Sequence, residues 1–277
     1  MTGVDADGMA SGEGGRIPAK PGPVRQTGAL PDFVLIGAQK GGTTTLYRLL
    51  GQHPSVRPAA RKELHYFSTQ YARGLDWYRG CFPDAEASPG TITGEGSPYY
   101  LFHPHSPRRM AETVPDVRLI AMLRNPVDRA YSHHRMLKNM GEEPLGFEEA
   151  LEAEEGRLRG ELEKMLADEL YVSFDHQYFS YLSRGLYVDQ LLRWSGFFRR
   201  DQMLVLRSED FFERPMETLN QVLAFLGLTK WEPEEWEIVL KGEYDGGMNP
   251  QTRRRLKGFY RPHNERLYEY LGRDMGW

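Results

Sequence analysis

A glycine-rich segment, IGAQKGGTTTL at residues 36–46, carries the residue types that bind phosphate. Gly37 and Gly42 keep the glycine spacing of a nucleotide triphosphatase loop, G-x-x-x-x-G-K-[ST], but Thr43 stands where that loop has its lysine. The lysine of this segment, Lys40, lies inside the loop. In a triphosphatase the lysine reaches the β and γ phosphates, and the hydroxyl behind it holds magnesium. The displaced lysine therefore favours a shorter ligand without metal, such as a 5′-phosphate that carries one transferable group.

The residues around this loop predict the strand, loop and helix that a phosphate site requires. Phe33 to Gly37 is a short apolar run typical of a buried strand, and leucines at helical spacing follow the loop. Gly41 and Gly42 allow a ligand to approach the backbone closely. The helix N-terminus adds N–H donors and partial positive charge. Three hydroxyl donors complete the predicted cradle: Thr43, Thr44 and Thr45.

A second strand-to-helix unit, at residues 117–137, carries another pair of anion-binding side chains. Arg124 follows the strand-like run Val117–Leu123, at the carboxyl end where ligands bind in open α/β sheets. Ser132 lies on the next helix, which Asn125 and Pro126 are expected to start. An arginine fork with a hydroxyl makes a phosphate clamp. Two anion sites on neighbouring strands predict a nucleotide that is phosphorylated at two positions.

Further segments alternate between strand and helix along the chain. Residues 203–210 (MLVLRSED) predict a strand, and helices are expected at about 147–170, 177–198, 215–226 and 261–271. This alternation predicts an α/β fold, with a single domain built on a central parallel sheet and helices on both faces. Residues 1–31 are rich in Gly, Pro, Ala and Ser and are expected to form a disordered tail, with the domain at residues 32–277.

The composition of the 277-residue chain limits the classes of function. A net charge of -4 does not indicate a nucleic-acid partner held by bulk electrostatics. The single cysteine, Cys81, rules out an internal disulfide framework and indicates a reducing compartment, most simply the cytoplasm. No apolar run approaches the ~18 residues that a membrane span needs, and no secretory signal is visible. The basic residues are mostly arginine, which favours a GC-rich bacterial genome.

Five motifs in the same order resemble the sulfotransferase family that uses 3′-phosphoadenosine 5′-phosphosulfate as donor. They read IGAQKGGTTTLYRLLGQHP, RKELHYFS, GEGSPYY, LRNPVDRAYS and FYRPHNERLYEYLGRDMGW, and the resemblance covers most of residues 33–277. The most similar branch holds the heparan sulfate N- and 3-O-sulfotransferases and their bacterial small-molecule relatives. The resemblance implies that adenosine 3′,5′-bisphosphate is the nucleotide product and that no metal ion is needed.

The resemblance also implies a role for each matching residue. The loop from Lys40 to Thr45 would bind the 5′-phosphosulfate, and Lys40 would stabilise the leaving phosphate. Arg124 and Ser132 would bind the 3′-phosphate. Two further segments would contact the donor: Arg184 with Gly185 near the adenosine, and Gly246–Pro250, with Met248 and Asn249, as a late loop. The chain departs from the heparan enzymes in that loop, where Asp245, Gly246 and Gly247 replace Lys-Gly-Arg, and at Gly96, where those enzymes have a lysine.

Two residues compete for the role of general base. Glu63, in RKELHYFS, matches the carboxylate base of the family. His65 lies two residues later and has the better intrinsic pKa for proton transfer near neutral pH. The alternative for Glu63 is an ion pair with Lys62 or Arg61, and the alternative for His65 is packing beside its aromatic neighbours.

The acceptor is expected to be a small molecule, such as a phenolic or sugar-containing secondary metabolite. Aromatic residues with polar tips follow Ser97-Pro98 and suit a planar acceptor. The candidate acceptor contacts are His65, Tyr99, Tyr100, His103 and His133, the last as a surface or substrate-side residue. The sequence leaves the acceptor atom and the oligomeric state open.

Two other functions remain compatible with the motifs. A P-loop kinase or nucleotide triphosphatase would depend on magnesium, and the displaced Lys40 argues against it. A non-catalytic protein that binds adenosine bisphosphate would keep its function after the substitution Glu63→Gln.

Overall fold

The computed structural model describes residues 28–84, 89–234 and 247–277. Most of the predicted tail therefore lies outside the described residues, as do Asp245 and Gly246 of the predicted late loop. Gly28 forms a backbone bridge with Asp84, and the N–H of Ala29 donates to the carbonyl of Pro83. Contacts with the domain thus start before Asp32, where the sequence predicted the domain to begin.

A five-stranded parallel sheet forms the centre of the domain, in the order β2-β3-β1-β4-β5. The strands span Phe33–Gly37 (β1), Val56–Pro58 (β2), Ile92–Gly96 (β3), Arg118–Leu123 (β4) and Met203–Arg207 (β5). In the central register, Phe33 lies opposite Gly94 on one side and Arg118 on the other. The predicted α/β class with a central parallel sheet is confirmed. Because the strands are parallel, their carboxyl ends meet at one edge of the sheet.

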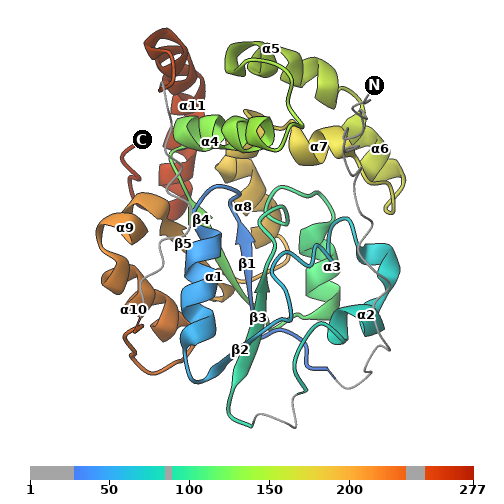
Figure 1. Cartoon of the computed structure of the whole chain (residues 1–277), viewed down its shortest axis with the longest axis vertical. Coiled ribbons are helices and arrows are strands. Elements are labelled where there is room, and N and C mark those ends of the chain that lie inside the picture. Colours follow the sequence, from blue (N-terminus) through green and yellow to red (C-terminus); the bar gives the residue numbers. More distant parts are fainter. Residues whose placement is uncertain (1–27, 85–88, 235–246) are drawn as a thin grey trace, which may run out of the picture.

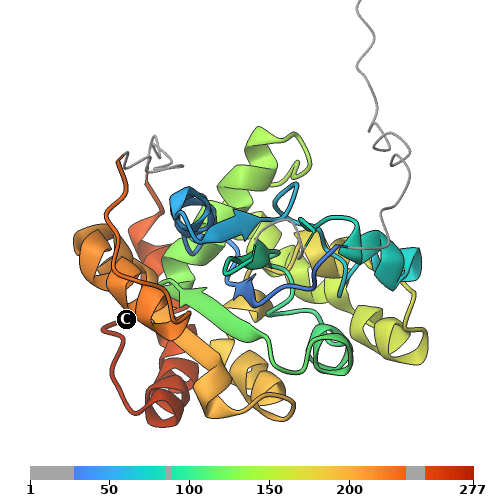
Figure 2. The same cartoon turned by 90° about the horizontal axis from the view of Figure 1, so that it is seen from below.

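Helices cover both faces of this sheet, as the sequence predicted (Figures 1 and 2). One face packs on α1 (Thr43–Gln52), α9 (Ser208–Glu213) and α10 (Pro215–Phe225). The other packs on α2 (Leu75–Arg79), α3 (Ser106–Thr113) and α8 (Tyr187–Ser195). Alternate residues of β1 serve the two cores, since Val34 and Ile36 belong to one and Phe33 and Leu35 to the other.

A further group of helices lies across the carboxyl edge of the sheet (Figure 1). These helices are α4 (Pro126–Asn139), α5 (Phe147–Leu158), α6 (Glu161–Ala167) and α7 (Phe174–Tyr178). The long α11 (Pro250–Leu271) begins beside α4 and continues along α8, where Leu267 joins the core of that face. A third apolar cluster joins α4, α5 and α11 through Val127, Phe147 and Leu256. None of the helices in the described part of the chain is long and apolar enough to cross a membrane.

Two strands, β2 and β3, were not predicted from the sequence, and a third, β5, was predicted too long. β3 reads ITGEG and contains two glycines and a buried glutamate, and β2 has only three residues, so neither shows an apolar run. The predicted strand at residues 203–210 ends at Arg207, because Ser208 begins α9. Acidic residues in the first turn of α9, Glu209 and Asp210, complement its dipole and favour a helix start there.

Three predicted helices have different bounds in the structure. The expected helix at 147–170 is two helices, because Gly160 has φ 78° and breaks the chain between α5 and α6. The expected helix at 177–198 is α7, a 3₁₀ turn at Ser183–Gly185 and α8. Glu154 holds that turn by accepting hydrogen bonds from the N–H groups of Leu182 and Ser183. α11 begins at Pro250 rather than at residue 261, and its first turn is capped by the Asn249 side chain.

A prediction tests the packing of β1 against β3. A methyl group at Gly94 would lie 2.6 Å from three ring atoms of Phe33, which is fully buried. Gly94→Ala is therefore expected to lower the free energy of unfolding by about 1–3 kcal/mol. The matched control is Gly156→Ala in α5, where no atom lies within 4 Å and a gain of up to about 1 kcal/mol is expected. Denaturant unfolding measures both, and equal effects would contradict the packing.

Candidate functional site

A cavity of about 680 Å³ lies where the carboxyl ends of the strands meet the helices above them. Residues from the segments that follow all five strands line it, together with α4 and α7, and the segment after β2 carries Glu63 and His65. Its lining brings together many residues that the sequence predicted: Lys40, Gly42, Thr43, Thr44, Glu63, His65, Tyr99, Arg124, Ser132 and Arg184. One cavity thus holds both predicted anion sites and both candidate bases.

The glycine loop places the N-terminus of α1 at the cavity. Gly42 has φ 93°, a left-handed conformation that favours glycine, and it starts the helix. The N-cap residue, Gly42, has no side chain to cap this end, and the first N–H groups of such a helix are the donors that bind a phosphate. Gly41 lies behind the loop, where an added Cβ would be 2.2 Å from the carbonyl oxygen of Met122. Gly41 and the buried Thr45 therefore shape the cradle but do not line the cavity.

The loop after β4 adds the second anion site. The guanidinium of Arg124 donates to the carbonyl of Lys40 at 3.3 Å, so this loop contacts the glycine loop directly. Tyr187 holds the same loop from α8, since its hydroxyl donates to the carbonyl of Arg124 at 2.8 Å. Asn125 caps α4, which places Ser132 nearly two turns along the helix in the cavity wall. Arg124, Ser132 and Lys40 thus line the same cavity.

Arg184 ties the glycine loop to the wall formed by α7. Its buried guanidinium donates to the Gln39 side chain and to the carbonyls of His176 (3.2 Å) and Gln177 (2.6 Å). Its carbon atom Cζ lies 5.0 Å from the centre of the Tyr99 ring. Burial lowers the pKa of Arg184 to about 9, which still leaves it charged near neutral pH. The structure therefore shows Arg184 as a link between two walls of the cavity, in addition to lining it.

Glu63 lies between two cationic or hydrogen-bonding partners. One carboxylate oxygen is 2.6 Å from Nζ of Lys62, and the other is 3.4 Å from Nε2 of His65. Burial raises the pKa of Glu63, but hydrogen bonds and charge from His65 and Lys62 outweigh it and bring the pKa to about 2. The carboxylate is thus ionised at every physiological pH. The ion pair with Lys62 that the sequence offered as an alternative is present, and the carboxylate also lines the cavity.

Three cavity residues have a backbone that side chains rarely adopt. Lys40, Glu63 and His65 have φ of 70°, 62° and 55°, and they are the non-glycine residues with positive φ in the described part of the chain. Such conformations cost roughly 1–3 kcal/mol each and persist where the surrounding structure imposes them. At Glu63 the core imposes the conformation, because Leu64, the residue between the two candidate bases in the sequence, is fully buried. The backbone strain is therefore concentrated at the candidate catalytic residues.

A buried carboxylate behind the cavity supports this turn. Glu95 of β3 accepts hydrogen bonds from the hydroxyls of Tyr78 (3.0 Å), Tyr100 (2.8 Å) and Ser97 (2.6 Å). Ser97 in turn accepts from the backbone N–H of His65 at 3.0 Å. Burial raises the pKa of Glu95, and the three hydroxyl bonds oppose that rise. The network thus fixes the backbone beside Glu63. Glu95, Ser97 and Tyr100 all lie in GEGSPYY, but the sequence did not show that Glu95 is buried or that Tyr78 and His65 join the network.

Several predicted acceptor contacts lie behind the cavity wall. Tyr100 is fully buried with its hydroxyl on Glu95, and His103 is buried beside Tyr99 at a ring distance of 5.3 Å. The expectation that His133 is a surface or substrate-side residue is wrong. It is fully buried beside Tyr181, and burial holds its pKa well below the usual range. These residues support the wall and cannot reach an acceptor in this arrangement.

Three predicted donor contacts also lie outside the cavity lining. Gly185 is buried against the hydroxyl of Tyr260, where an added Cβ would be 2.7 Å away. Met248 packs on the apolar cluster of α4 and α11, and the Asn249 side chain caps α11. Arg253, which follows this loop on α11, forms an ion pair with Asp128 at 2.8 Å.

The cavity lining also contains residues that the sequence did not indicate. They are Gln39, Pro98, Asp128, Met136, Met140, Gln177, Tyr178, Ser208, Glu209, Phe212 and Glu213. For the three on α4, a signal existed. Asp128, Met136 and Met140 lie four or eight residues from Ser132 and so share its helix face. The others come from loops and short helices, whose position depends on tertiary contacts.

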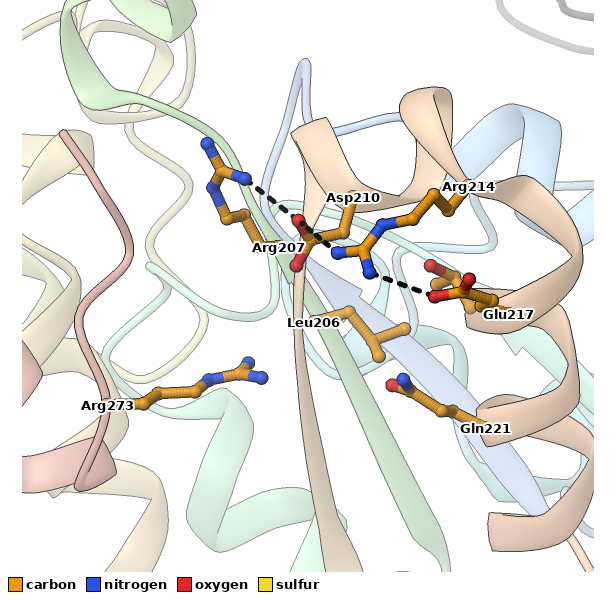
Figure 3. A pocket seen from close by; sticks show the side chains of 8 residues that line it. Leu206, Arg207, Asp210, Arg214, Glu217, Gln221 and Arg273 are labelled. Atoms are coloured by element: carbon orange, nitrogen blue, oxygen red, sulfur yellow. Dashed lines mark hydrogen bonds and ion pairs between the residues drawn. The ribbon is translucent and has the colours of Figure 1, made fainter.

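A second, smaller cleft of about 60 Å³ lies between β5, α9, α10 and the C-terminal segment (Figure 3). Asp210 accepts from Arg207 at 2.8 Å and from Arg214 at 3.4 Å, and Arg214 also pairs with Glu217. Arg273 donates to the carbonyl of Val205. The arginines of this cleft are thus used to join β5 to α9 and the C-terminal segment. The larger cavity is the candidate active site.

The chain is similar to known proteins along most of its length. Residues 30–242 match the family model of the sulfotransferase domain. Human heparan sulfate glucosamine 3-O-sulfotransferase 6 is 31% identical over an alignment that covers 94% of this chain and 77% of that protein. The membrane-associated sulfotransferase kil1 of Dictyostelium discoideum is 27% identical and aligns with 90% of this chain, which spans 66% of its length.

A solved structure shows the same fold. The crystal structure of a sulfotransferase from Alicyclobacillus acidocaldarius matches with a TM-score of 0.69 and 32% sequence identity. The match covers 89% of this chain and 97% of that one.

A prediction tests the buried network behind the cavity. Tyr100→Phe removes one hydroxyl bond to the buried Glu95 carboxylate, so the free energy of unfolding is expected to fall by about 1.5–3 kcal/mol. Tyr171→Phe is the matched control, because its hydroxyl also bonds a glutamate, Glu161, but Tyr171 is only half-buried and Glu161 keeps its ion pair with Lys164, so a smaller loss is expected. Chemical denaturation of both variants measures the difference. A Tyr100 variant as stable as the control would show that Glu95 does not depend on this bond.

Proposed function

The chain belongs to the sulfotransferase family, and we propose that it transfers a sulfuryl group from 3′-phosphoadenosine 5′-phosphosulfate to a small-molecule acceptor. The sulfotransferase family consists of transferases that use this donor. The observation that carries the proposal is the shared cavity of Lys40, Arg124 and Glu63, which combines two anion sites with a carboxylate. The bond would form to a hydroxyl or amine of the acceptor.

The residues of the cavity fit a nucleotide with two separate phosphate groups. The uncapped N-terminus of α1, Lys40 and the hydroxyls of Thr43 and Thr44 would hold the 5′ end. Arg124 and Ser132, on the next strand and helix, would hold the 3′-phosphate. When bound, the donor supplies an activated sulfuryl group on a phosphate leaving group.

Lys40 is suited to the charge that develops during transfer. Negative charge grows on the bridging oxygen as its bond to sulfur breaks, as in phosphoryl transfer. The positive φ of Lys40 places its backbone within the loop, and its side chain lines the cavity beside the N-terminus of α1. A positioned donor of this kind is worth roughly 2.7–4 kcal/mol of barrier.

Glu63 would accept the proton of the acceptor, with His65 holding the carboxylate in place. The carboxylate is ionised and lines the cavity, which supports a role as base. Its low pKa makes it a weak base while both partners are bound. An acceptor hydroxyl that takes the place of Lys62 beside Oε1 would remove one lowering interaction. Glu63 is therefore proposed as the base and His65 as the residue that orients it.

The lining favours a small acceptor over a sulfated polysaccharide. The arginines and lysines among the described lining residues are Lys40, Arg124 and Arg184. The first two are assigned to the donor, and the third is buried and bonded to Gln39 and α7. A polyanionic acceptor would therefore find no free basic side chain among them. A phenolic or sugar-containing secondary metabolite fits the remaining polar and aromatic wall, with Tyr99, Gln177 and Tyr178.

Nucleotide preference tests the proposed donor. Adenosine 3′,5′-bisphosphate is expected to raise the melting temperature more than ATP with magnesium, because the loop holds Lys40 and no lysine follows Gly42. Preference for ATP with magnesium would favour a P-loop kinase or triphosphatase instead.

A substitution tests the role of the loop lysine. Lys40→Met is expected to lower kcat about 10²–10³-fold through the lost stabilisation of the leaving oxygen. The control Lys257→Met removes an exposed lysine of α11 and should leave kcat unchanged. Steady-state transfer assays measure both. Bisphosphate binding without any transfer, in wild type and with a broad acceptor panel, would instead favour a nucleotide sensor.

The pH profile distinguishes the two candidate bases. The pKa of Glu63 in the folded protein is about 2, below its usual value of about 4.3. Its contribution to stability is therefore complete above about pH 4.3 and is lost as the pH falls toward 2. With Glu63 as base, kcat/KM should show no acid limb between pH 5 and 8. An acid limb near pH 6.5 that disappears in His65→Gln would assign the base to His65. Glu63→Gln is expected to reduce kcat roughly 10²–10⁴-fold.

A further inference from the structure

The face of α4 that lines the cavity changes from polar to apolar along its length. Asp128, Ser132, Met136 and Met140 follow one another at intervals of four residues, and all four line the cavity. The polar pair lies near Arg124, at the start of the helix, and the methionines lie at its end. Met136 is half-buried and packs on the apolar cluster of α4, whereas Met140 is 58% exposed. The cavity therefore has a polar donor end and an apolar end.

Aromatic residues from α7 extend this apolar end toward solvent. Tyr178 lines the cavity, and the ring of Phe174 stacks on it at a centroid distance of 4.5 Å. Phe174 is 49% exposed, and Val172 just before it is 50% exposed. Contiguous exposed apolar side chains at the mouth of a cavity are typical of a ligand-binding groove. Met140, Tyr178 and Phe174 thus continue the cavity wall onto the surface.

Charge at this end of the cavity favours an uncharged ligand. Lys40 and Arg124 lie at the donor end, and Arg184 is engaged with the loop and α7. Four carboxylates line the cavity and would repel an anion, namely those of Glu63, Asp128, Glu209 and Glu213. Methionine side chains are flexible and polarisable and adapt to apolar ligands of varied shape.

We propose that the acceptor is an uncharged amphiphile, a hydroxyl compound whose reactive end reaches Glu63 and whose apolar body lies along Met136, Met140 and Tyr178. This inference rests on the proposed sulfotransferase function and names the class of acceptor for the same site. The half-buried ring of Tyr178 and the exposed ring of Phe174 extend the contact for acceptors longer than the cavity. Affinity for the acceptor therefore increases with the length of its apolar body.

Binding to the nucleotide complex tests this inference without relying on turnover. Wild-type protein is first titrated with adenosine 3′,5′-bisphosphate, and the saturated complex is then titrated with 4-ethyl-, 4-butyl- and 4-hexylphenol by calorimetry. The Kd is expected to fall by up to about fourfold for each added methylene. Met136→Gln and Met140→Gln are expected to flatten this dependence and to weaken 4-hexylphenol binding at least about tenfold when combined. Leu192→Gln, at an exposed site of α8 outside the cavity, is the matched control and should keep the wild-type dependence.

The outcomes separate the inference from the function on which it rests. Failure of the wild-type protein to bind the bisphosphate would refute the proposed function itself. Bisphosphate binding with equal affinity for all three phenols would overturn the amphiphile and leave the transferase standing. The amphiphile would also be overturned, with the transferase left standing, if a sulfated oligosaccharide bound the complex more tightly than 4-hexylphenol. It would likewise be overturned if the chain-length dependence survived in the double methionine variant.

Discussion

The parallel direction of the five strands is the constraint on which the site depends. Since all carboxyl ends meet at one edge, the segments that follow the five strands come together there, including the segment after β2 that carries Glu63. Lys40 and Arg124 belong to neighbouring strands, and their loops touch through the hydrogen bond from Arg124 to the carbonyl of Lys40. Two anion sites in contacting loops suit one ligand with two phosphate groups. An antiparallel neighbour would have sent one of these loops to the opposite edge.

A buried arginine joins this edge to the helices above it. Arg184 bonds the glycine loop through Gln39 and the α7 segment through the carbonyls of His176 and Gln177. A guanidinium can serve several carbonyls at once because its donors form a rigid fork. The donor end and the acceptor wall are therefore parts of one bonded unit. Arg184 is a single side chain that bonds both the donor end and the acceptor wall.

The turn that carries Glu63 is held from behind by a carboxylate that never meets solvent. Glu95 accepts hydrogen bonds from three hydroxyls, and one of these, the hydroxyl of Ser97, accepts a hydrogen bond from the backbone N–H of His65. This support offsets the unfavourable positive φ of Glu63 and His65. A carboxylate on such a turn is held in one position, as preorganised proton transfer requires. The fully buried Leu64 anchors the same turn from within the core.

The sequence by itself determined the local parts of this protein. It predicted the strand, loop and helix around Lys40, the position of Arg124 at a strand end, the helix start at Pro126 and the parallel sheet, because these follow from nearby residues and short periodicities. Only the tertiary structure decided which side chains share the cavity. β3 has no apolar run, and its buried Glu95 is compatible with a core strand only because Tyr78, Tyr100 and Ser97 bond its carboxylate. His133 and Tyr100 have polar side chains that suit a substrate, yet packing buries both. Burial and partners depend on residues far apart in the chain, and the order of residue types does not record them.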